Sequence, residues 1–136
     1  MKRLILVSTV VLMLNTAFLA QQRNNHRIDN ALAACLKNAR ATMPRAECYS
    51  KAFDAWKSDV TKTYAALRLA LPIDARPVFE RSQRNWEKYR DSEFELIANL
   101  YAARKGTGYI ATRIILRTDR VKNRALVLEE RLEAYK

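Results

Sequence analysis

Apolar residues recur every three or four positions along most of the chain, which is the spacing of one face of an α-helix. A short segment at 29–40 carries such residues at Leu32, Cys35, Leu36 and Ala39. A longer segment at 45–71 carries them at Cys48, Ala52, Trp56, Val60, Thr63, Leu67 and Ala70. The pattern therefore predicts a short helix followed by a long one.

Two further segments show the same periodicity. The first, at 75–104, has an inner face of Phe79, Gln83, Trp86, Tyr89 or Arg90, Phe94 or Glu93, Ile97, and Leu100 or Tyr101. The second, at 109–134, has a seam of Ile110, Ile114, Val121, Ala125, Leu128, Leu132 and Tyr135. Both segments are long enough to form helices that cross a whole small domain.

The helix-breaking residues fall between these four segments. Pro44, Pro72 and the Gly106–Gly108 turn separate them, and the whole chain contains only two glycines and three prolines. Asp29 and Asp74 are the expected N-caps of the first and third helices. Few breakers and three long amphipathic segments predict an all-α fold. We expect an antiparallel helical bundle of three long helices plus a short N-terminal helix.

The first twenty residues have the composition of a secretory signal. Lys2 and Arg3 precede an apolar run at 4–14, and the segment closes on Ala20. The run is shorter than the ~20 residues of a membrane span, although an uncleaved anchor remains the alternative. We expect a signal peptide at 1–20, cleaved near Ala20, a flexible segment at 21–28 and a helical domain at 29–136. The expected location is the bacterial periplasm or the secreted fraction.

Cys35 and Cys48 are the two cysteines of the chain. An exported protein with an even number of cysteines usually pairs them. The pair can meet if the first two helices pack as a hairpin, so a disulfide would tether the short helix. The alternative is two buried free thiols.

The chain is strongly basic, with a net charge of +11 that falls to +9 once Lys2 and Arg3 are removed. This charge favours anionic partners such as wall polymers or phospholipid, including peripheral membrane contact. Export and the lack of a recognition motif disfavour nucleic acid. On the last helix, a basic stripe recurs at Arg113, Arg117, Arg120 and Arg124, with Arg104 and Lys105 just before the turn. The candidate anion-binding residues are Arg104, Lys105, Arg113, Arg117 and Arg120. Alternatively, these arginines lie along the core edge and pair with acids of the third helix.

The parts of a catalytic site are missing from the sequence. There is no glycine-rich phosphate loop and no cluster with the spacing of metal ligands, and His26 is the sole histidine. Acidic pairs such as Glu93 and Glu95 are typical of solvated helix faces. We therefore expect no enzyme activity, no cofactor and no metal.

The densest motif is Gln83-x-x-Trp86-x-x-Tyr89-Arg90-Asp91-x-Glu93 in the third helical segment. The structural interpretation is that Trp86 fills the core while the polar residues bond between helices. The other interpretation is a ligand-binding role, because buried polar groups are costly unless they find partners.

Three features of the sequence belong together: this motif, the two early cysteines, and the residues Tyr64, Leu67 and Leu71 at the end of the second segment. Together they resemble the LprI-like lysozyme-inhibitor domain. The resemblance extends over nearly the whole mature chain, through the Gly106–Gly108 turn to Arg124 and Leu128 in the last segment. It implies an exported envelope protein that binds a protein partner, with lysozyme as one candidate. Binding of an anionic envelope polymer or phospholipid through the arginine stripe is the alternative function.

The chain departs from the family pattern at one informative position. Many members have a cysteine directly after the motif glutamate, with a partner in the last helix, whereas here Phe94 follows Glu93 and no cysteine comes later. We expect an apolar contact around Phe94 in place of that second disulfide. The net positive charge also predicts long-range repulsion from animal-type lysozymes, which are strongly basic, unless a local acidic edge such as Asp91, Glu93 and Glu95 docks them.

Overall fold

The computed structural model describes residues 26–136, so the predicted signal peptide lies outside the described residues. This part of the chain forms four α-helices, joined at one corner by a short 3-10 turn, and has no strand. The helices are α2 (Arg27–Asn38), α3 (Thr42–Ala70), α4 (Arg76–Ala102) and α5 (Thr107–Glu133), with the 3-10 turn at Ile73–Ala75. The all-α prediction is confirmed, as are its three long helices and one short one.

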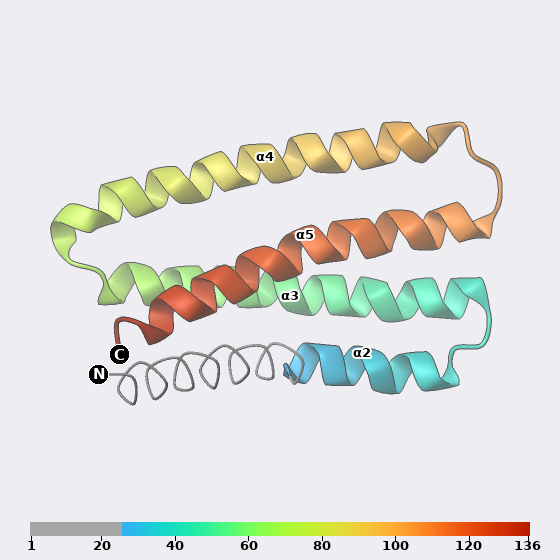
Figure 1. The fold of residues 1–136 in the computed structure, drawn as a ribbon, viewed down its shortest axis with the longest axis horizontal. Helices are drawn as coiled ribbons and strands as arrows, with labels where there is room; N and C mark the ends of the chain where they lie inside the picture. Colours follow the sequence, from blue (N-terminus) through green and yellow to red (C-terminus); the bar gives the residue numbers. More distant parts are fainter. Residues whose placement is uncertain (1–25) are drawn as a thin grey trace, which may run out of the picture.

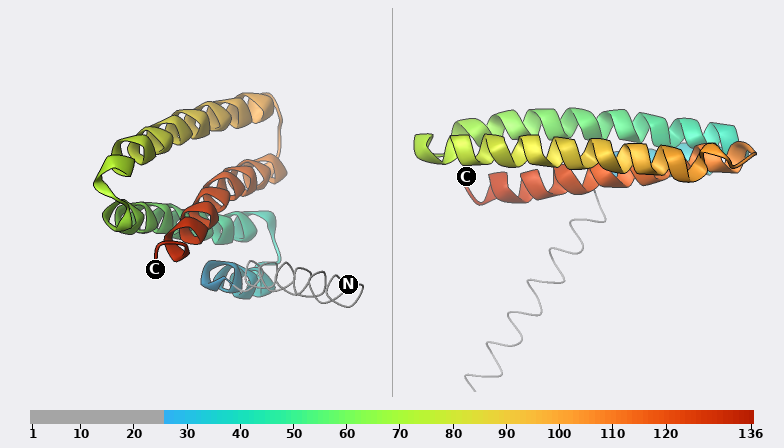
Figure 2. Two further views of the ribbon diagram at one scale, coloured as in Figure 1. Left: turned by 60° about the vertical axis from the view of Figure 1, so that its left-hand side comes forward. Right: turned by 90° about the horizontal axis from the view of Figure 1, so that it is seen from above.

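The helices run back and forth along one long axis (Figure 1). The pair α3 and α5 makes the most extensive contact, α2 packs on α3, and α4 packs on α5 while touching α3 at few positions. Two further views show the resulting elongated bundle (Figure 2). Helix α4 is therefore the least embedded of the three long helices.

A disulfide joins Cys35 of α2 to Cys48 of α3, with the two Cα atoms 5.8 Å apart. The predicted pairing is confirmed, and it fixes the C-terminal half of the short helix. The other end of α2 is held by side chains, since Ile28 is buried and Asp29 binds the Lys122 ammonium at 2.8 Å. The short helix is thus anchored at both ends.

The core lies mainly between α3 and α5. The largest fully buried side chains are Trp56, Leu67, Leu128 and Val121. Each fully buried apolar side chain of this size stabilises the fold by roughly 1.5–3 kcal/mol through its removal from water. No helix in residues 26–136 has the length and apolar content to cross a membrane.

The helix ends differ from the expected ones at two caps. Helix α2 begins at Arg27, and its N-cap is His26, whose side chain accepts a hydrogen bond from the Ile28 N–H. Asp29 lies inside the first turn, where its negative charge interacts favourably with the positive end of the helix dipole. Residues 26–28, which we expected in a flexible segment, are thus part of the fold. The predicted cap at Asp74 is also wrong, because Asp74 lies in the 3-10 turn and Ala75 precedes α4.

The ends of the predicted apolar faces are more exposed than their periodicity suggests. On α4, Tyr89 is 55% exposed and Leu100 is 59% exposed, whereas Phe79, Gln83 and Ile97 are buried. On α5, Ile110 and Tyr135 at the two ends of the seam are exposed. For α4, the physical reason is that it has one close neighbour, α5, so only a narrow strip of the α4 surface is covered.

Candidate functional site

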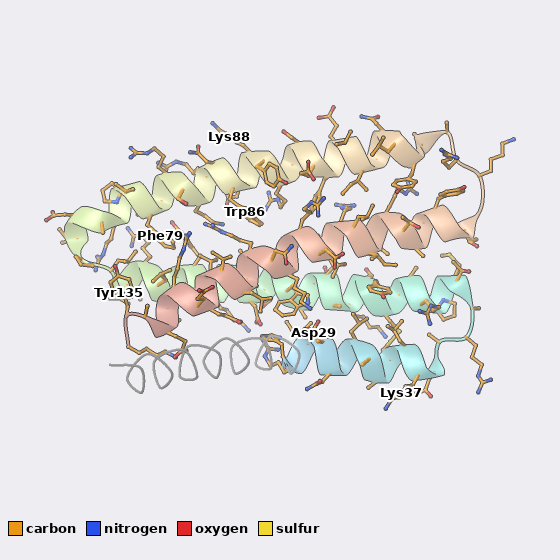
Figure 3. The ribbon with its side chains drawn as sticks, viewed as in Figure 1. Asp29, Lys37, Phe79, Trp86, Lys88 and Tyr135 are labelled. Atoms are coloured by element: carbon orange, nitrogen blue, oxygen red, sulfur yellow. A yellow bond between two sulfur atoms is a disulfide. The ribbon has the colours of Figure 1, made fainter. Side chains whose placement is uncertain are left out.

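The motif residues of α4 divide between its inner and outer sides. Gln83 is buried, Trp86 and Arg90 are half-buried, and Tyr89 and Asp91 are exposed. Figure 3 shows Trp86 directed from α4 toward α5, while Lys88 points away from the bundle. The α4 strip that carries Gln83 and Trp86 therefore faces α5, as the helical spacing predicted.

Gln83 is the centre of a buried polar network. Its side-chain oxygen accepts hydrogen bonds from Nε and Nη2 of Arg124, at 3.1 and 2.7 Å. Its amide nitrogen donates to Glu87 Oε1 at 3.1 Å. Burial lowers the pKa of Arg124, and the nearby charge of Arg131 lowers it further, while Glu87 acts in the opposite direction. The Gln83 side-chain oxygen thus offsets part of the cost of burying the Arg124 guanidinium.

Replacing Gln83 by leucine is expected to lower the free energy of unfolding by about 1.5–3 kcal/mol, the value of a hydrogen bond to a charged group. The variant leaves Arg124 buried without the oxygen that it now binds. Adding Arg124→Met should restore part of the loss, because an apolar pair of similar volume removes the uncompensated charge. Urea unfolding of the single and double variants measures both values. A double variant less stable than Gln83→Leu alone would contradict the network.

Trp86 packs against the edge of the apolar core, and two guanidinium groups lie over its ring. The Cζ atom of Arg90 lies 5.1 Å from its ring centroid, and that of Arg124 lies 5.4 Å away. The indole is half-buried, and the fully buried tryptophan of this chain is Trp56. Trp86 thus contributes to the edge of the core, as the structural interpretation expected, while the open side of α4 leaves part of the ring uncovered.

The arginine stripe of α5 turns toward α4 in its central part. Arg120 Nε donates to Glu93 Oε2 at 2.9 Å, and this bond raises the pKa of Arg120. Arg113 is half-buried, while Arg104 and Lys105 are exposed in the α4–α5 connection. Arg120 therefore follows the structural alternative, in which the stripe pairs with acids of the third long segment.

Arg117 lies against aromatic rings. Its Cζ atom lies 4.4 Å from the Phe94 centroid and 5.5 Å from the Phe53 centroid. Its Nε atom is buried and has no hydrogen-bond partner among residues 26–136. The two rings are also in contact with each other, with centroids 6.0 Å apart, which agrees with the expected apolar contact around Phe94.

A cleft of about 400 Å³ opens beside these residues. Its walls come from α3 and α4, and two side chains of α5, Arg117 and Val121, complete the lining. The α4 wall includes Gln83, Trp86, Arg90, Asp91 and Phe94, and the α3 wall includes Phe53, Lys57, Val60 and Tyr64. Most of the motif therefore lines one cleft, which the sequence spacing alone did not reveal.

Residues 91–102 of α4, which we call the acidic half of α4, differ in charge from the rest of this basic protein. They carry Asp91, Glu93 and Glu95 and no lysine or arginine. Glu95 is exposed, and so are Leu96, at 50%, and Leu100, at 59%. This part of the surface therefore offers acidic and apolar side chains together.

A second cluster, which sequence reasoning missed, surrounds His26. Its Nε2 atom lies 3.3 Å from Glu129 Oε1 and 3.8 Å from Asp59 Oδ2, and its ring stacks on Trp56 with centroids 4.2 Å apart. These three side chains have the chemistry of metal ligands and lie close enough to share an ion. However, Nδ1 accepts a hydrogen bond from Ile28 N–H, so the proton of the neutral ring lies on Nε2.

The His26 cluster therefore links α2, α3 and α5 through polar contacts between side chains. Coordination through Nε2 would move the proton to Nδ1 and end the cap of α2. Asp59 also pairs with Arg27, which compensates its buried charge. The sequence held one signal of this cluster, since Asp59 is a charged residue directly beside Val60 in the apolar stripe of α3.

Comparison with known proteins supplies the remaining evidence. The family model "Lysozyme inhibitor LprI" matches residues 33–128, which is most of the chain. The chain belongs to the LprI family. The matched range includes both cysteines, the α4 motif and Arg124, so the family pattern covers all the elements that build the cleft. The LprI family is an inhibitor family and not an enzyme family.

One solved structure gives independent support for the fold of this LprI-family chain. It is the crystal structure of an uncharacterized protein from Burkholderia thailandensis, with a TM-score of 0.75 and 30% sequence identity. The alignment covers 81% of this chain and 55% of that protein, so this chain spans about half of its length. No curated protein matches the chain.

Proposed function

We propose that this protein is an exported cell-envelope binding protein that inhibits lysozyme by binding its surface. Membership of the LprI family is the observation that carries this proposal. The signal-like composition of residues 1–20 supports export, and the disulfide suits an oxidising compartment. The expected partner is another protein, and the site of contact is a helix surface.

The acidic half of α4 is the surface that we propose for this contact. Animal-type lysozymes are strongly basic, so the net charge of this chain opposes their approach at long range. At short range the exposed Glu95 presents a carboxylate, and Leu96 and Leu100 present apolar area, without a neighbouring lysine or arginine on residues 91–102. A mixed apolar and acidic surface is suited to docking a basic protein.

The alternative function, polyanion binding through the arginine stripe, has fewer available residues. Arg120 is ion-paired with Glu93, and Arg117 lies under the Phe94 ring. Arg104, Lys105, Arg113 and Arg117 have no ion pair within residues 26–136, and of these Arg117 is covered by aromatic rings. Lysozyme inhibition is therefore the function that we propose, and binding of an anionic polymer is the alternative.

The purified mature protein is expected to slow lysis of cell walls by a basic animal-type lysozyme at micromolar concentration. Glu95→Lys should weaken inhibition at least about tenfold, because it places like charges opposite each other at the contact. Glu47→Lys is the matched control, since Glu47 is also exposed on a helix and the charge change is the same. The measurement is the rate of turbidity loss over a series of inhibitor concentrations.

No slowing of lysis at tenfold molar excess would refute inhibition. An equal loss with Glu47→Lys would show that overall charge, and not the acidic half of α4, controls the effect. If the protein instead binds anionic vesicles and releases them as salt rises, the polyanion alternative gains support.

A further inference from the structure

The cleft between α3 and α4 contains a guanidinium group that lacks an anion. Within residues 26–136, Arg120 pairs with Glu93 and Arg90 with Asp91, whereas no ion pair involves Arg117. Its Nε atom is buried without a hydrogen-bond partner. A charged group with a buried, unsatisfied donor is costly. Because Nε itself is covered, a ligand anion in the cleft would pair with the other nitrogens of the Arg117 guanidinium, which borders the cleft.

The two acids of the cleft lining, Glu87 and Asp91, each accept a hydrogen bond from a neighbour. Glu87 accepts a hydrogen bond from the Gln83 amide, and Asp91 accepts one from Arg90 Nε at 2.8 Å. Lys57, on the opposite wall, adds a further cation. The lining therefore carries three cations, Lys57, Arg90 and Arg117, against two carboxylates, so its net charge is positive.

Apart from Thr61 and Gln83, the remaining lining is apolar and mostly aromatic. Phe53, Tyr64, Trp86 and Phe94 contribute rings, and Val60 and Val121 contribute aliphatic surface. The volume of about 400 Å³ falls in the range of small-molecule sites, which combine apolar walls with a few placed polar groups. An apolar body with one anionic group fits this combination.

We propose that this cleft binds a small organic carboxylate, with its apolar part between Phe53, Trp86 and Phe94 and its carboxylate on the Arg117 guanidinium. Arginine suits this role because its planar fork matches a carboxylate, and the rings beneath it hold the fork in place. The cleft shares Asp91 and Phe94 with the acidic half of α4, whereas the exposed Glu95, Leu96 and Leu100 of the proposed lysozyme contact lie outside its lining. Binding of the carboxylate does not depend on lysozyme inhibition.

The test uses 3-phenylpropionate as the probe and 3-phenylpropionamide as its uncharged counterpart. In ¹H–¹⁵N spectra of the full mature protein with its disulfide intact, the carboxylate should shift the Arg117 Nε–H signal and the indole N–H signal of Trp86. The indole N–H signal of the buried Trp56 should stay in place. The amide should bind at least about tenfold more weakly, since it lacks the charge that Arg117 recognises.

Arg117→Met keeps an unbranched apolar side chain against the rings but removes the charge, and it should weaken carboxylate binding at least about tenfold. Arg113→Gln, one turn earlier on α5 and outside the cleft lining, is the control and should leave binding unchanged. If Arg117→Met fails to fold, the spectra of the unmodified protein still decide the question. Equal binding of carboxylate and amide, absence of binding at millimolar probe, or an equal loss with Arg113→Gln would overturn the proposal.

Discussion

Replacing Trp56 by alanine is expected to lower the free energy of unfolding by about 3–5 kcal/mol, the range for truncating a large buried aromatic side chain. Trp56 is 0% exposed, and its ring stacks on His26, which caps α2. The Lys122 ammonium also lies 5.6 Å from the ring centroid. Truncation therefore opens a cavity between α3 and α5 and loosens the attachment of α2 in the same step.

Urea unfolding followed by far-ultraviolet circular dichroism measures this effect. Trp86→Ala is the matched control, because it removes the same side chain from a half-buried position, and we expect it to cost about 1–2 kcal/mol. Its loss includes the contacts with the guanidinium groups of Arg90 and Arg124. A larger loss of stability for Trp86→Ala than for Trp56→Ala would contradict the assignment of the core to the interface between α3 and α5.

Removal of the disulfide is expected to cost about 3 kcal/mol, the chain-entropy value for a loop of roughly 15 residues. Cys35 and Cys48 are separated by 13 positions in the sequence. Helix α2 has 12 residues, and an isolated helix of that length is only marginally stable in water. Docking of α2 therefore depends on the disulfide at one end and, at the other end, on the contacts that His26 and Asp29 make with α3 and α5.

The double variant Cys35→Ala/Cys48→Ala should show this loss in urea unfolding. Its amide hydrogen exchange should rise most in the last turn of α2, near Lys37, and least near Ile28, which stays buried. Uniform exchange across α2 would mean that the side-chain contacts at Ile28 and Asp29 do not hold the helix without the bond. A variant as stable as the original protein would show that the disulfide is not a structural constraint.

The number and order of the helices were predictable because the period of the apolar residues is a local property. Trp56, Leu67 and Leu128 lie on the expected faces, and the Cys35–Cys48 pair formed as predicted. The helix ends were less predictable, since His26 replaced Asp29 as the cap of α2. That outcome depends on a tertiary contact, the stack of His26 on Trp56, which periodicity does not encode.

The candidate site was only partly predictable for a similar reason. Spacing placed Gln83 and Trp86 on the inner side of α4, but it did not specify how closely α4 approaches α3. The loose contact between these helices leaves the cleft open and Trp86 half-buried. Likewise, the stripe on α5 was visible in sequence, whereas the difference between the paired Arg120 and the unpaired Arg117 depends on residues of α3 and α4.

We propose that this LprI-family chain acts through the exposed surface of α4, and a titration of the ¹⁵N-labelled mature protein with unlabelled lysozyme tests this most directly. We expect saturable changes of backbone amide signals that concentrate on residues 91–102, with α2 and the buried seam of α5 unaffected. Changes confined to the basic α4–α5 connection at Arg104 and Lys105 and to the nearby Arg113 of α5, or no change at stoichiometric lysozyme, would contradict this proposal.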